Sequence, residues 1–166
     1  MLSFYTGTAR ATVDVDFIIG GGHFDRAAKA VEANYSELRY NNKTFHVTYD
    51  TTRNVKDPER IDLVHGTQPL FREVVSNHSV TIRDAGHVIK LPSYEAAMAL
   101  KYGAIVSPNR GDKRNIDAYD LERLAKARKT SDERTLSKLG NLVFPGGGDE
   151  LVDAIADMRL GKPVRL

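Results

Sequence analysis

The chain has 166 residues, 41% of them hydrophobic, and a formal net charge of +2. This length suits one domain with its own core, and so small a net charge does not by itself indicate a nucleic-acid partner. The chain has no cysteine, which excludes disulfides, thiolate zinc sites and a cysteine nucleophile. It also lacks an apolar run long enough to span a membrane and a signal-peptide pattern. We therefore expect a cytoplasmic protein with no membrane partner.

The first predicted strand covers residues 11–19 and contains two aspartates, Asp14 and Asp16. Because side chains alternate along a strand, both aspartates project to one side, while Val15 and Phe17 project to the other, into a core. Two carboxylates one pleat apart repel each other unless a cation lies between them, and ligation by oxygen alone suits Mg²⁺. The alternative is an edge strand that carries two solvated acids.

The predicted elements that follow are mostly strands in the first half of the chain and helices in the second. In chain order they are a helix (23–35), a hairpin (38–49), a strand (60–65), a short helix (69–75), a second hairpin (80–91) and helices at 93–104, 113–129, a short stretch from 131, and 149–160. Ser93 is the expected N-cap of the first long helix. This order predicts an α+β fold with a helical C-terminal layer.

Asp62 is a third acid with an unusual setting. It lies in mid-strand between Ile61 and Leu63, where an acid is costly to bury unless it is ligated or paired. If this strand lies beside the first one, Asp62 joins Asp14 and Asp16 on one face. Three converging acids can hold the divalent ions that phosphoryl or nucleotidyl transfer needs. The alternative is an acid at the edge of its strand.

A buried aspartate is also predicted in the helical half. Asp117, Leu121 and Leu124 are spaced i, i+4 and i+7, so Asp117 shares the apolar face of its helix. A buried aspartate needs a partner, and Lys101 on the preceding helix is the best candidate, with Asp120 one turn further on extending the pair. Whether this pair serves catalysis or joins two helices is left open by the sequence.

Several segments resemble one family. Residues 7–16, Gly-Thr-Ala-Arg-Ala-Thr-Val-Asp-Val-Asp, are similar to the G-x-x-R-x-T-x-D-[IV]-D segment of minimal nucleotidyltransferases of the AbiEii-like kind, in the DNA polymerase β-like superfamily. Residues 60–63 resemble the strand of the third acid, residues 88–101 a hairpin-to-helix segment that ends in lysine, and residues 116–124 the k-D-x-x-D-l-x-x-L helix. The resemblance implies a mixed β-sheet with helices packed on it. Residues 1–127 would form the nucleotidyltransferase-like domain and residues 128–166 a helical extension of it.

The resemblance implies a role for each acid of the strands. Asp14 and Asp16 would hold Mg²⁺ on a nucleoside triphosphate. Asp62 would complete the metal site and take the proton from an acceptor hydroxyl, whose oxygen attacks the α-phosphorus. The acceptor would be RNA or protein, and the family includes toxins of toxin–antitoxin systems.

Four further residues are implied as substrate-binding. Arg10 and Thr12 would contact phosphate or brace the first strand. Lys101 would face the triphosphate or neutralise an acid, and Asp117 would accompany it.

The chain departs from the family pattern at its start. The family carries a Gly-Gly or Gly-Ser pair at the start of a helix upstream of the first aspartate, where backbone N–H groups hold phosphate. Nothing before Gly7 fits that pair, so this helix is expected to be missing. A misplaced start codon, a fragment, or a loss of transferase activity would each account for it, and the exposed apolar surface would favour a homo-oligomer.

Two alternatives to an active transferase follow. One is a catalytically inactive or truncated module that binds a nucleotide or a partner. The other is a hydrolase that uses the same acids with water.

Overall fold

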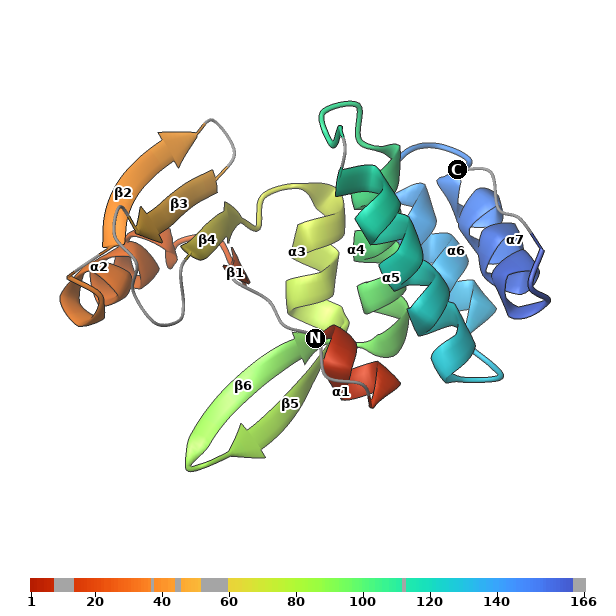
Figure 1. Cartoon of the computed structure of the whole chain (residues 1–166), viewed down its shortest axis with the longest axis horizontal. Coiled ribbons are helices and arrows are strands. Elements are labelled where there is room, and N and C mark those ends of the chain that lie inside the picture. The colour runs from red at the N-terminus through yellow and green to blue at the C-terminus, as the bar shows by residue number, and fades with distance from the viewer. Residues whose placement is uncertain (8–13, 37, 44–45, 52–59, 112, 163–166) are drawn as a thin grey trace. The chain divides into compact units, whose positions relative to one another are not determined.

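The computed structural model describes residues 1–7, 14–36, 38–43, 46–51, 60–111 and 113–162 (Figure 1). The chain divides into two compact units, one formed by Ala11–Val75 and the other by Met1–Arg10 with Ser76–Leu166. Strands and helices segregate as the sequence predicted, and the fold class is α+β. The predicted division at residue 127 stays a prediction.

The unit Ala11–Val75 is built on a four-stranded mixed sheet. Its strands in spatial order are β1 (Asp14–Ile19), β4 (Arg60–His65), β3 (His46–Thr51) and β2 (Leu38–Lys43). β1 pairs with β4 in parallel, whereas the β4–β3 and β3–β2 pairs are antiparallel. Helix α2 (Phe24–Asn34) connects β1 to β2, and α3 (Pro69–Asn77) follows β4 (Figure 1).

The core of this unit lies on one face of the sheet. Ile61 and Leu63 of the interior strand β4 are buried there with Leu38 of β2, against Val31 of α2. Because side chains alternate on a strand, Asp62 projects to the opposite face. The packing of Ile61 and Leu63 therefore fixes which side of the sheet Asp62 occupies.

The prediction that Val15 and Phe17 enter the core is wrong. Val15 is 38% exposed and Phe17 46%. They are in register with Ile61 and Leu63, but β1 is the edge strand of the sheet as far as the structure describes it. An edge strand has a neighbour on one side only, which leaves its apolar side chains partly uncovered.

The second unit consists of a hairpin and a group of helices. Strands β5 (Ser79–Asp84) and β6 (His87–Pro92) form the predicted hairpin, whose turn residues Ala85 and Gly86 both have positive φ, as a type I′ turn requires. The helices are α4 (Tyr94–Val106), α5 (Lys113–Ala127), α6 (Glu133–Asn141) and α7 (Gly147–Arg159). The Ser93 side chain accepts a hydrogen bond from the Ala96 N–H, which confirms the predicted N-cap.

Helix α4 is the centre of this unit. It packs against α5 and α6, and α7 packs against both α5 and α6 (Figure 1). Seven of its residues are buried, including Met98 and Tyr102, neither of which is exposed. Lys101 lies between these two on a helix that is held from more than one side, so the position of its backbone is well fixed.

The short helix α1 (Leu2–Thr6) was not predicted from the sequence. Gly7 ends it in the left-handed conformation, with φ of 65°. Tyr5 donates a hydrogen bond to a backbone carbonyl of β6, and the Arg128 guanidinium lies 5.5 Å from the Tyr5 ring centroid and 4.5 Å from that of Tyr94. A glycine ends α1 rather than starting it, so α1 is not the phosphate-binding helix that the resemblance describes.

The close approach of α6 and α7 gives a first test. A Cβ at Gly140 would lie 2.5 Å from the carbonyl oxygen of Gly147. We expect Gly140→Ala to lower the free energy of unfolding by about 1–3 kcal/mol, because overpacking outweighs the better helix propensity of alanine. Gly21→Ala is the matched control, since a Cβ there meets no atom within 4 Å. Urea unfolding of both variants measures the difference, and equal losses would contradict the expectation.

Candidate functional site

An acidic face on β1 and β4 is the first part of the candidate site. The parallel pairing of the two strands sets Asp16 opposite Asp62 and Asp14 opposite Arg60. Positions 14, 16, 60 and 62 share one face of the sheet, because each pair of positions on a strand is two residues apart. The strand of Asp62 therefore lies beside the first strand, as the prediction of an acidic face required.

Asp62 is buried, and its partner is an arginine from its own strand. The residue is 6% exposed. Arg60 Nε donates to Asp62 Oδ1 at 3.1 Å, and Arg60 Nη2 donates to Asp62 Oδ2. One guanidinium therefore engages both carboxylate oxygens, which is a strong and directional arrangement.

Arg60 was not among the residues predicted for the site. The signal was available, because residues i and i+2 of a strand lie on the same face. An arginine two residues before a buried aspartate is therefore a natural partner for it.

The structure describes the remaining residues predicted for this face only in part. Asp16 is exposed. Asp14 is described as part of β1, but its side chain, and the whole of Arg10 and Thr12, lie outside the described residues. The edge position of β1 agrees with the alternative of an edge strand, yet Asp16 is no isolated surface acid, because it is in register with the buried Asp62.

The chemistry of this face fits a hard divalent cation. Among the described side chains, no three acids or histidines cluster as a metal site, and Asp14 was outside that comparison. Asp16 and Asp62 nevertheless offer carboxylate oxygens from neighbouring strands in register, and oxygen donors are what Mg²⁺ prefers. Asp62 already holds a cationic group, the Arg60 guanidinium. The donor set is thus suited to Mg²⁺.

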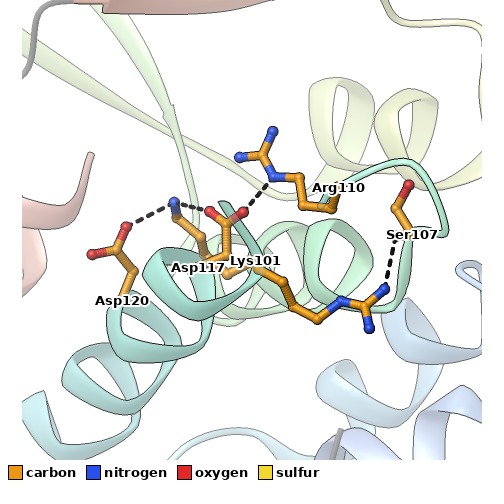
Figure 2. Close-up of polar contacts among 6 residues, drawn as sticks. Lys101, Ser107, Arg110, Asp117 and Asp120 are labelled. Carbon is orange, nitrogen blue, oxygen red and sulfur yellow. Dashed lines mark hydrogen bonds and ion pairs between the residues drawn. The ribbon is translucent and has the colours of Figure 1, made fainter. Parts of the chain in front are cut away.

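A second charged cluster joins α4 to α5 in the other unit (Figure 2). Lys101 Nζ lies 2.8 Å from Asp117 Oδ1 and 2.9 Å from Asp120 Oδ2. Asp117 is 2% exposed and Asp120 1%. The predicted ion pair between Lys101 and Asp117, and its extension to Asp120, are confirmed.

Arg110 completes this cluster and was not predicted. Its Nε lies 2.5 Å from Asp117 Oδ2, so Asp117 receives one cation on each oxygen (Figure 2). Arg110 lies between α4 and α5, where Arg114 Nη2 also donates to the Ser107 carbonyl oxygen at 3.4 Å. A residue between two helices has no periodicity to follow, which is why the sequence pattern gave no sign of it.

The electrostatic state of Asp117 follows from these contacts. Burial alone would raise the pKa of the Asp117 carboxyl, but the hydrogen bonds from Arg110 and Lys101, together with their charges, outweigh burial and hold the pKa below its usual value. Asp117 is therefore charged near neutral pH. It keeps Lys101 and Arg110 beside each other despite their like charges.

No helix among the described residues has both the length and the apolar character to span a membrane.

Comparison with known proteins places the chain among nucleotidyltransferases. The model of a family described as "Nucleotidyl transferase AbiEii toxin, Type IV TA system" matches residues 1–162. Among solved structures, the chain is similar to an antigenic nucleotidyltransferase-like protein from Paracoccidioides brasiliensis, with 15% identity and a TM-score of 0.54 over 97% of this chain and 81% of that one. At this identity the likeness supports the fold alone. None of the curated proteins matches.

The pKa of Asp117 gives a pH-dependent test. A carboxyl whose pKa is lower in the folded state adds stability above its unfolded pKa of about 3.9, and this stability is lost as the pH falls through the folded pKa. We expect Asp117→Asn to cost about 3–5 kcal/mol near neutral pH, because it breaks a buried ion pair. The difference from wild type should shrink below about pH 4.

Urea unfolding at a series of pH values measures this difference. Asp153→Asn is the control, since Asp153 is an exposed acid on α7. A difference between wild type and Asp117→Asn that does not change with pH would contradict the expected coupling.

Proposed function

The chain belongs to the AbiEii nucleotidyltransferase toxin family, and on that premise we propose that it transfers a nucleoside monophosphate from a nucleoside triphosphate to a hydroxyl group on RNA or protein. The observation that carries the proposal is the register of Asp16 with the buried Asp62 on one face of the sheet. Type IV toxin–antitoxin systems are named in the description of the family. We accordingly propose that the protein acts as a toxin whose effect an antitoxin opposes.

Asp14, Asp16 and Asp62 are the residues proposed to hold Mg²⁺. When bound, the ion neutralises charge on the triphosphate and favours attack at phosphorus. Asp62 is fixed by the burial of its neighbours Ile61 and Leu63, whereas Asp16 is exposed. The fixed position of Asp62 supports its role as the acceptor of the proton.

The proposed reaction is a displacement of pyrophosphate at the α-phosphorus. The acceptor hydroxyl oxygen forms a bond to the α-phosphorus, and the bond from that phosphorus to the bridging oxygen of the leaving pyrophosphate breaks. The hydroxyl proton passes to the Asp62 carboxylate. This is the general-base role that a positioned carboxylate can perform.

Lys101 is proposed to contact the triphosphate, with Asp117 and Asp120 holding its ammonium group. A lysine ammonium has three donor hydrogens, and the ion pairs with the two aspartates account for two of them. Its side chain is 20% exposed, against 2% for Asp117, so solvent and small ligands can reach it. Arg10 and Thr12 are proposed to contact phosphate or to brace β1.

A module that binds a nucleotide or a partner without turnover is the second candidate. The observation that favours it is the engagement of both Asp62 oxygens by Arg60. A carboxylate held in this way can neither take a proton nor bind a metal ion until the arginine moves.

Transfer of labelled nucleotide separates the two candidates. We expect the wild-type protein with Mg²⁺ and one of the four α-labelled nucleoside triphosphates to label RNA or protein. Asp62→Asn should reduce the rate at least about 100-fold, because it removes the general base, and Asp16→Asn should also reduce it.

Asp25→Asn is the control for these variants, because Asp25 is an exposed acid on α2 of the same unit. Wild-type protein that arrests growth but labels no acceptor with any nucleotide would favour the binding module.

The role of Lys101 has its own test. Lys101→Arg keeps the charge that Asp117 and Asp120 require, so we expect it to stay folded and to lose at most a few degrees in Tm. If the ammonium contacts phosphate, the KM for the nucleotide should rise about tenfold, since arginine cannot place the same point charge. Lys113→Arg, at an exposed position on α5, is the control. An unchanged KM in folded Lys101→Arg would leave Lys101 with a structural role.

A further inference from the structure

The Arg60–Asp62 pair combines strong contacts with unequal burial. Both oxygens of Asp62 accept hydrogen bonds from the Arg60 guanidinium. The Asp62 side chain is 8% exposed, whereas that of Arg60 is 33% exposed. The guanidinium can therefore move into water at little cost in solvation, while the carboxylate stays where the strand fixes it.

The charge at the four positions of this face is not balanced. Positions 14, 16 and 62 carry aspartates and position 60 carries an arginine, on two strands in register. Acids therefore outnumber bases at these four positions. Carboxylates that lie near one another raise the free energy of the ionised state unless positive charge accompanies them.

The pairing geometry makes Arg60 compete with a divalent cation for the oxygens of Asp62. Arg60 reaches Asp62 from two residues away on the same strand, and its Cα is in register with that of Asp14. It thus approaches the oxygens of Asp62 from within the acidic face. A guanidinium that engages both oxygens leaves the carboxylate poorly disposed to ligate an ion.

We propose that Arg60 is a positioning residue that holds the Asp62 carboxylate while no divalent cation is bound and releases it when a cation binds. The inference rests on the function proposed for the same acidic face. Arg60 supplies a cationic partner to both oxygens of a buried carboxylate in the free protein. It thereby lowers the affinity of the face for the cation, because its own contacts with Asp62 must first be broken.

Binding of Mn²⁺ without nucleotide tests the competition directly. Isothermal titration of wild type and Arg60→Met with MnCl₂ should show at least about tenfold tighter binding by the variant, because a cation that competes and repels has been removed. Arg26→Met removes the same charge from an exposed position on α2 of the same unit and should leave the affinity near that of wild type. Adding Asp62→Asn to Arg60→Met should abolish the gain.

Thermal unfolding provides a readout that does not depend on activity. In EDTA, Arg60→Met should unfold at a lower temperature than wild type, because Asp62 is left buried without the guanidinium. Mn²⁺ should then raise the Tm of Arg60→Met more than that of wild type. If Arg60→Met does not fold, Arg60→Lys serves instead, since it keeps the charge but loses the two-pronged contact and should bind Mn²⁺ more tightly than wild type.

The outcomes separate this inference from the function on which it rests. Equal affinities of wild type and Arg60→Met for Mn²⁺ would contradict the proposed role of Arg60. The proposed metal site would be unaffected by that result. Weaker binding by Arg60→Met also overturns the role of Arg60, since Arg60 would then support the ion. Absence of Mn²⁺ binding to either protein overturns the metal site itself, and the inference falls with it.

Discussion

The cost of burying a carboxylate shapes both units of this protein. Asp62, Asp117 and Asp120 are buried, and each has a basic side chain within ion-pair distance. An ionised carboxylate without such a partner would lose several kcal/mol of solvation, and would give up its charge instead. The position of Arg60, Lys101 and Arg110 is therefore set by the acids that they neutralise.

The parallel pairing of β1 and β4 is what turns one of these buried acids into part of a candidate site. The two strands are far apart in sequence, and their parallel pairing sets Asp16 beside Asp62. A slip of one residue would turn Asp62 toward the core that Ile61 and Leu63 now fill, because side chains alternate along the strand. The packing of Ile61 and Leu63 thus keeps Asp62 on the opposite face of the sheet, and the pairing of β1 with β4 sets it opposite Asp16.

How far the sequence can predict such a site depends on whether a residue lies in a periodic element. Asp117 shares a helical stripe with Leu121 and Leu124, so its burial and its need for Lys101 could be predicted and are confirmed. Arg110 lies in a connection between helices, where no spacing rule applies. Arg60 lies on β4 two residues from Asp62 and so on the same face, a spacing from which its pairing with Asp62 could have been predicted.

The errors in the predicted fold have a similar origin. Val15 and Phe17 alternate as core residues should, but periodicity does not tell an interior strand from an edge strand. Helix α1 is only five residues long and depends on Tyr5 and Arg128, contacts that join distant parts of the chain. Short helices gain most of their stability from such packing rather than from their own sequence.

The two charged clusters differ in a way that bears on their function. Lys101 and Arg110 face Asp117 and Asp120, so the two cations and two acids of the helical cluster balance one another. The four positions on β1 and β4 instead carry three acids and one arginine. The helical cluster pairs each of its two buried acids with a cation, whereas these four positions of the sheet carry more acids than bases. This excess of acids is why the proposed metal-dependent chemistry is assigned to β1 and β4, while the role proposed for Lys101 is to contact phosphate.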